Sequence, residues 1–273
     1  MSGDRSVVLA AAAFGDDPGR WPLPAAQSSH DLWLRAVAAG GQGRYGSAHA
    51  DLAALRRRVG AGPLASLAHS TCASFVRQLG GHADARRWDG LACALAGSGP
   101  EADAEAAVDA LIGLAADALG LRRLAASAAL LDRARALLDE PGLPDRLSLR
   151  WHWVAAERAM VGGEGAEAVR HADRAAELAS ESGSARHRAK TAVVRAAALC
   201  SAGHVDLART VADDALINTG RLGLVPLRWA AASLLADIGS NVRDDADVHA
   251  IRDATAEAVR RGGGVWCPTP GRL

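Results

Sequence analysis

Apolar and polar positions along the chain follow the helical period, and the pattern is plainest near the C-terminal end. Within 246–261, Val248, Ile251 and Val259 lie on one helical face, while charged residues occupy the other face. Gly262 follows directly and marks the end of the helix. A polar outer face of this kind suits the terminal helix of a stacked array. Similar alanine-rich stretches recur upstream, so the pattern predicts helices almost throughout.

Composition supports a helical chain that is broken by short linkers. Hydrophobic residues make up 49% of the 273 residues, and alanine, the best helix former, dominates them. Strand-favouring Tyr and Phe number one and two. Segments rich in glycine, proline or serine separate the helical stretches at 60–63, 97–100, 140–144, 182–184 and 220–226.

A glycine follows six of the alanine-rich stretches at intervals of 36 to 43 residues. These marker glycines are Gly43, Gly80, Gly120, Gly163, Gly203 and Gly239. A small residue stands seven positions before each, and alanine stands five positions after all but the last, where Asp244 stands. Small facing residues let two helices approach, and glycine permits the tight turn between them. The register therefore predicts a helix–turn–helix unit repeated about six times.

These marks resemble the tetratricopeptide repeat family. That family has a small residue in the first helix of each unit, glycine at the turn, an aromatic residue shortly after it and alanine in the second helix. Gly43, Tyr45 and Ala48 match this pattern best, and the segments around Gly163 and Gly203 match the second helix. The resemblance implies an all-α fold, a right-handed α-solenoid of about six repeats. The chain departs from the family in its displaced early aromatic, in turns without tyrosine and in linkers too long for a 34-residue period.

The resemblance spans about residues 30–260 and suggests three parts of the chain. Residues 1–29 are expected to pack on the first repeat, and residues 30–262 to form the repeat domain. Three consecutive glycines at 262–264 lead into residues 263–273, which also contain prolines, and this favours a flexible tail. Within it, Trp266 is expected either to dock on the solenoid or to be disordered.

Charge, cysteine content and hydropathy exclude several classes of protein. Lys+Arg and Asp+Glu both number 31, so the basic excess that is typical of nucleic-acid binders is missing. The four cysteines are scattered, which favours reduced thiols in a cytoplasmic protein over a zinc site or a disulfide framework. No stretch approaches the length of a membrane span, and the apolar run 7–14 is short for a signal peptide.

Motifs for catalysis or for cofactors are not convincing in this sequence. Gly41, Gly43 and Gly46 spell GxGxxG, but a dinucleotide site requires a preceding strand, whereas this segment follows a helical stretch. The nine histidines show no metal-ligand spacing, and no nucleophile elbow is present. We therefore expect no enzyme activity, no cofactor and no metal.

Tryptophan marks the candidate binding face. Trp33, Trp153 and Trp229 each lie ten residues before a marker glycine. The resemblance places this position toward the concave groove, together with Glu157, and extends the groove to Arg77 and Lys190. Nearby are the basic residues Arg150, Arg195 and Arg228. Two interpretations stay open, because tryptophan is typical both of binding hot spots and of gap-filling in an alanine-rich core.

The most basic short stretch contains Arg186, His187, Arg188 and Lys190. A run of this length is usually a solvated surface, so a solvated helix start is the expected interpretation. A local contact with an anion is the alternative.

These observations favour a non-catalytic scaffold that binds a protein or peptide partner in the concave groove. The alternative is a regulatory or sensor domain whose groove holds a small ligand or nucleic acid and which acts in transcriptional control. The Ala- and Arg-rich composition is similar to that of actinobacterial proteins, in which helical repeats often accompany such regulators. The sequence also leaves homo-oligomers open, because incompletely capped solenoid ends can stack.

Overall fold

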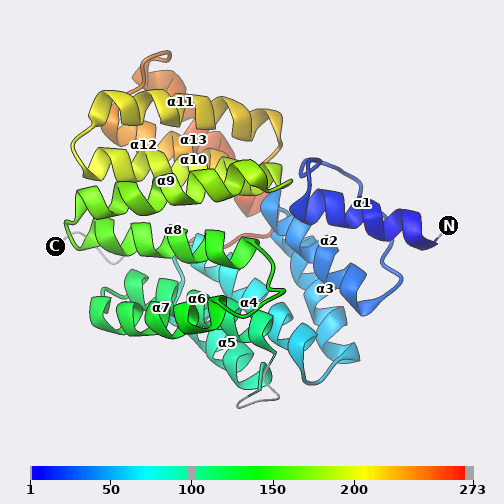
Figure 1. The fold of residues 1–273 in the computed structure, drawn as a ribbon. Coiled ribbons are helices and arrows are strands. Elements are labelled where there is room, and N and C mark those ends of the chain that lie inside the picture. Colours follow the sequence, from blue (N-terminus) through cyan, green and yellow to red (C-terminus); the bar gives the residue numbers. More distant parts are fainter. Residues whose placement is uncertain (1, 98–102, 268–273) are drawn as a thin grey trace.

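The computed structural model describes residues 2–97 and 103–267, and in these two segments every regular element is an α-helix (Figure 1). The expected all-α class is confirmed. The linker expected at 97–100 lies outside the described residues except for Gly97, as do residues 268–273 of the tail. The helices are α1 (Ser2–Phe14), α2 (Ser29–Gly41), α3 (Tyr45–Arg58), α4 (Pro63–Gln78), α5 (His82–Leu95), α6 (Ala104–Gly120), α7 (Leu124–Leu138), α8 (Arg146–Val161), α9 (Gly165–Glu181), α10 (Ala185–Ser201), α11 (Val205–Arg221), α12 (Val225–Ile238) and α13 (Asp245–Arg261).

Helices that follow one another pack as neighbours, as in a helical repeat. The most extensive packing joins α2 to α3, α4 to α5, α6 to α7, α8 to α9, α10 to α11 and α12 to α13. Each pair also packs on the next one along the chain. The right-handed sense of the solenoid, the number of true repeats and the tetratricopeptide assignment stay predictions.

Left-handed glycines make the turns within these pairs at five of the six marked positions. The φ angles are 78° at Gly43, 89° at Gly80, 76° at Gly163, 84° at Gly203 and 82° at Gly239. Residues with a Cβ are strained in this region, so the sequence register reflects a backbone requirement.

Between α6 and α7 the expected register was wrong by two residues. Gly120 is still helical, and Arg122 takes the left-handed turn position with φ 58°. Gly120 is needed for another reason, because a Cβ there would lie 2.2 Å from the ring of His82. Once the register is moved by two residues, the small positions of this unit become Ala115 and Ser127, both fully buried.

The corrected register shows why alanine dominates the chain. The residues seven positions before each turn residue are all alanine and all fully buried: Ala36, Ala73, Ala115, Ala156, Ala196 and Ala232. The separation of two packed helices depends on the side chains at their contact, so a methyl group at this position permits the closest approach. Alanine here sets the packing distance within each pair.

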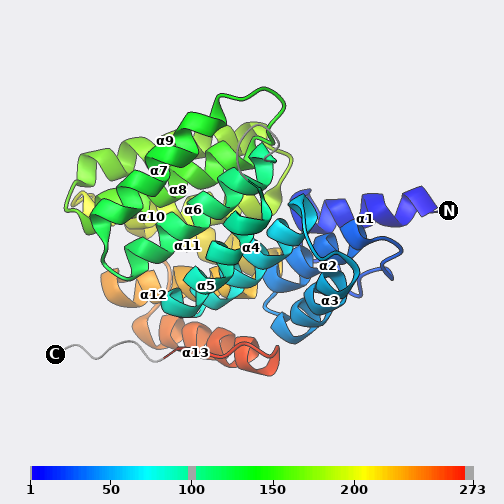
Figure 2. The ribbon, with the colours of Figure 1, turned by 90° about the horizontal axis from the view of Figure 1, so that it is seen from below.

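Six helices form an inner layer, because each helix of the series α2, α4, α6, α8, α10 and α12 contacts the next member of the series. The series also closes, since α12 contacts α2. At the same place the amide N of Gly46 donates to the carbonyl O of Gly262 over 2.7 Å. Figure 2 shows α12 and α13 along the lower edge of the molecule, toward α3. The open groove implied by the resemblance is therefore closed where the first and last helix pairs meet.

Both chain ends reinforce this closure. Helix α1 packs on α2, and it also reaches α10, where the amide of Ala185 donates to the carbonyl of Gly15 over 2.9 Å. The amide of Cys267 donates to the carbonyl of Leu79 over 2.8 Å. The indole of Trp266 packs against that of Trp229 in a tilted arrangement, with ring centroids 4.4 Å apart. Residues 263–267 are thus docked, which differs from the flexible tail that the glycines suggested.

In the part of the chain that the structure describes, no helix combines the length and the apolarity that a bilayer span requires. Cys72, Cys93, Cys200 and Cys267 are free thiols.

We expect Gly262→Ala to destabilise the protein by about 2 kcal/mol, because an added Cβ would lie 2.0 Å from the carbonyl O of Gly43. That obstacle is backbone and cannot turn away. Urea unfolding followed by circular dichroism measures the effect. Gly183→Ala is the control, because a Cβ at Gly183 meets nothing within 4 Å. Equal unfolding midpoints for the two variants would contradict the role of the closure.

Candidate functional site

The inner helices line a cavity of about 380 Å³. Each of the six inner helices contributes to its wall, and Phe14 of α1 and Trp266 of the tail complete it. The volume falls in the range of small-molecule sites, which are concave and mostly apolar with a few polar groups. The cavity is therefore the candidate functional site.

All six residues that the sequence singled out line this one cavity. They come from α2, α4, α8, α10 and α12, yet their side chains face the same space: Trp33, Arg77, Trp153, Glu157, Lys190 and Trp229. Of the three neighbouring basic residues, only Arg150 lines it. Arg195 pairs with Asp173 on α9 over 2.7 Å, and Arg228 lies against Gly220 of α11.

Two of the three tryptophans are core residues that also form the cavity wall. Trp33 is 6% exposed and Trp153 is 8% exposed. Each indole Nε1 donates to a threonine on the next inner helix: Trp33 to Thr71 over 3.0 Å and Trp153 to Thr191 over 2.9 Å. Trp229 is only partly buried and is covered by Trp266. The core interpretation thus describes Trp33 and Trp153, although both also border the cavity.

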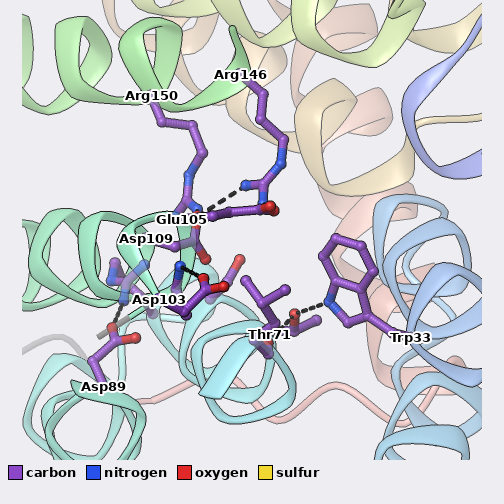
Figure 3. A network of polar contacts seen from close by, with 12 residues as sticks. Trp33, Thr71, Asp89, Asp103, Glu105, Asp109, Arg146 and Arg150 are labelled. Carbon is purple, nitrogen blue, oxygen red and sulfur yellow. Dashed lines mark hydrogen bonds and ion pairs between the residues drawn. The ribbon is translucent and has the colours of Figure 1, made fainter. Parts of the chain in front are cut away.

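Ion pairs cross the cavity wall between α8 and α6. Figure 3 shows Arg146 and Arg150 reaching from α8 toward Asp109 and Glu105 of α6. Arg146 pairs with Glu105, and with Asp109 over 3.0 Å, while Arg150 pairs with Asp109 as well. Two guanidinium groups thus share one nearly buried carboxylate, which fixes the spacing of the two helices.

A second, deeper network surrounds Arg77 of α4. Its guanidinium pairs with Asp89 of α5, and with Asp117 of α6 over 2.7 Å. Both carboxylates are fully buried. Burial raises the pKa of Asp89 to about 8, and the charge of Asp117 adds to this rise, whereas the charges of Arg77 and Arg150 oppose it. Arg77, expected in a partner-binding groove, is therefore chiefly an internal ion-pair residue whose side chain also borders the cavity.

The basic run at the start of α10 points inward rather than to solvent. Arg186, His187 and Lys190 line the cavity, and only Arg188 is exposed, so the expected solvated surface was wrong for three of the four residues. Lys190 pairs with Glu157 over 3.0 Å. Burial, followed by the charges of Arg186, Arg146 and Arg150, lowers the pKa of His187 well below its usual value, so this imidazole is neutral.

Sequence reasoning missed Arg146 and Asp109 and placed Arg186 at a solvated helix start, although a signal for all three positions existed. Arg146 and Arg186 occupy equivalent positions, each seventeen residues before a turn glycine, Gly163 or Gly203. Asp109 lies thirteen residues before Arg122, equivalent to Arg150 and Lys190, and the two-residue error in the third unit hid this match.

Among the described residues, no group of three or more His, Cys, Asp or Glu side chains is placed to hold a metal ion. No protein-family model matches the chain, and no curated protein is significantly similar to it. The function therefore has to be argued from the cavity itself. Its wall combines four tryptophans and two phenylalanines with paired charges, which is a surface suited to binding.

Trp153→Ala is expected to destabilise the fold by about 4 kcal/mol, because it empties a core position and leaves the hydroxyl of Thr191 without its indole partner. Thermal or urea unfolding measures the loss. Trp21→Ala, at a ring that is 42% exposed, should cost less than about 1 kcal/mol. Similar costs at the two positions would mean that Trp153 is not part of the core.

The stability of the Asp89→Asn variant should increase relative to that of the native chain as pH rises. Unfolded aspartate ionises near pH 3.9, whereas folded Asp89 keeps its proton up to about pH 8, so rising pH removes stability from the native chain across this window. The asparagine variant lacks that loss. Urea midpoints of both proteins at about pH 5 and about pH 8.5 test this. A difference between the two proteins that stays constant with pH would contradict the raised pKa.

Proposed function

We propose that this chain is a non-catalytic ligand-binding protein that holds a compact, partly apolar small molecule in its central cavity. The observation that carries this proposal is the closure of the inner layer, where α12 contacts α2 around a space of about 380 Å³. Such a space suits a molecule of drug or metabolite size. The proposal corresponds to a cytoplasmic sensor domain rather than to an open scaffold.

An extended peptide or a helix lies along an open concave surface. In this chain the hydrogen bond between Gly46 and Gly262 joins the two ends of the layer. Helix α1 and Trp266 add further wall. A compact ligand makes better use of such a space, because it can contact several inner helices at the same time.

A ligand inside the ring would also change the stability of the whole molecule. It would bridge α2 and α12, which are far apart in sequence and contact each other only lightly compared with the helices of a pair. A ligand that binds only the folded state stabilises it in proportion to the logarithm of its concentration over Kd. This coupling supports a role as a sensor, in which the outer helices report the state of the cavity to a partner.

A protein- or peptide-binding scaffold of the tetratricopeptide type is the second candidate. One observation favours it: the residues implied by the resemblance, among them Trp229 and Glu157, all face the same space. A single acidic or aromatic side chain of a partner would enter the cavity while the rest of the partner stays outside. Association between copies of the chain belongs to this second candidate.

The neutral dye N-phenyl-1-naphthylamine tests whether the cavity accepts a compact apolar molecule. We expect one molecule of dye to bind per chain with enhanced fluorescence, and Ala116→Phe to weaken binding at least about tenfold, because Ala116 lines the cavity and a phenyl ring would fill it. Fluorescence titration measures the affinity.

The control is Ala136→Phe, which places the same ring on the exposed face of α7. This variant should bind the dye as the native chain does, and circular dichroism should show both variants folded. If the native chain bound acidic peptides of about a dozen residues but not the dye, the scaffold would replace the small-ligand proposal.

A further inference from the structure

Arg186 stands out among the cations of the cavity because no carboxylate accompanies it. Arg77, Arg146, Arg150 and Lys190 each pair with at least one acid. Within the described residues, Arg186 makes no ion pair or hydrogen bond, and its Nε is buried without an acceptor. Buried charges in folded proteins are nearly always paired, because an unpaired one loses its hydration without compensation.

The position of Arg186 on its helix makes this more unusual. It lies in the first turn of α10, where the positive end of the helix dipole disfavours a cation. Burial, followed by the charges of Arg150 and Arg146, lowers its pKa to about 10. The dipole of α10, the burial of the side chain and the charges of Arg146 and Arg150 all disfavour a positive charge on Arg186. An anion at this place would relieve all three.

The Arg186 guanidinium lies against the ring of Phe14, which belongs to a cluster of aromatic side chains. Its central carbon lies 5.5 Å from the ring centroid of Phe14, and the Arg146 guanidinium is also 5.5 Å from this ring. The ring of Trp33 lies 5.3 Å from Phe14, and the ring of His187 lies 6.0 Å from it. Because His187 is neutral, the cluster offers one free positive charge beside an apolar wall.

We infer that Arg186 is the anion subsite of the cavity, and that the ligand is a flat, apolar molecule carrying one oxyanion, such as a carboxylate, a sulfonate or a phosphate ester. This inference rests on the proposed ligand-binding function and specifies the chemistry of the ligand. Phe14, Trp33 and Trp153 contact the apolar body, and the Arg186 guanidinium pairs with the oxyanion. The carboxylates beside Arg146 and Arg150 keep those arginines occupied, so a single negative charge is selected.

The test compares two dyes that share one ring system. 1-Anilinonaphthalene-8-sulfonate carries a single anionic group, and N-phenyl-1-naphthylamine is its uncharged counterpart. Arg186→Gln should weaken binding of the sulfonate at least about tenfold, since it removes a charge-assisted contact, and should change binding of the neutral dye less than about twofold. Fluorescence titration gives both affinities.

Arg228→Gln is the matched control for this comparison. Arg228 also has a buried Nε without an acceptor, but it does not line the cavity. Its substitution should leave both affinities unchanged. If Arg186→Gln bound both dyes as the native chain does, the anion subsite would be overturned while the cavity stood. If neither dye bound the native chain, the proposed function itself would fail.

Stability gives an independent readout that a purely structural arginine would not produce. Arg186→Met removes the unpaired charge and keeps an apolar side chain, so the ligand-free variant should melt at least about 2 °C above the native chain. A lower melting temperature for this variant would mean that Arg186 supports the fold, and would overturn the inference.

Competition distinguishes the sources of the oxyanion. 1-Naphthoate and 1-naphthyl phosphate should displace the bound sulfonate dye from the native chain, and the more effective of the two identifies a carboxylate or a phosphate ester as the preferred group. 1-Naphthol has the same rings without the charge and should displace it at least about tenfold less well. Equal displacement by 1-naphthol would overturn the inference.

Discussion

The contact between the turn of the first helix pair and the end of the last one is the constraint on which the rest of the structure depends. A backbone amide at Gly46 reaches the carbonyl of Gly262, and no side chain stands between the two segments. A Cβ on Gly264 would lie 2.9 Å from the ring of Tyr45, so the close approach continues into the tail. Stacked helix pairs normally contact only their neighbours and leave two free ends. Here the ends meet, and an inner surface that would be an open groove becomes the wall of a cavity.

The local half of this fold could be predicted from the sequence, because helices and turns depend on nearby residues. Alanine at Ala36 or Ala156 and left-handed glycine at Gly43 or Gly163 recur at fixed offsets and are visible without coordinates. The unit between α6 and α7 was misplaced because Arg122 adopts the backbone conformation that glycine usually takes. The closure could not be predicted, since it brings together residues more than two hundred positions apart. The triple glycine that makes the closure possible looks like a flexible hinge in sequence alone.

Part of the site could also be predicted from the sequence, namely the face that carries the tryptophans, whereas the pairing of its charges could not. The face that carries Trp33, Trp153 and Trp229 follows from the repeat register, and the structure places these residues on one cavity. The charges beside them depend on which helices meet across the interior. Arg77 is matched by Asp89 and Asp117 from two other helices, a pairing that no spacing along the chain reveals. A basic run such as the one at the start of α10 looks like a solvated surface until the closure turns it inward.

Pairing of charges separates the structural cations of the cavity from the one that is available to a ligand. An ion pair in a partly buried wall loses hydration, and the attraction between its two fixed partners compensates for this loss. Such a pair positions helices, and because its charges already neutralise each other, it attracts a ligand only weakly. Arg146 and Arg150 are of this kind, because both contact Asp109. Arg186 bears the cost of partial burial, and within the described residues no carboxylate compensates its charge. Proteins tolerate such a cost mainly at functional sites, where binding returns it. The fold therefore contains, beside its aromatic wall, a positive charge that the closed ring holds in place and leaves uncompensated, which is the arrangement that an anionic ligand would complete.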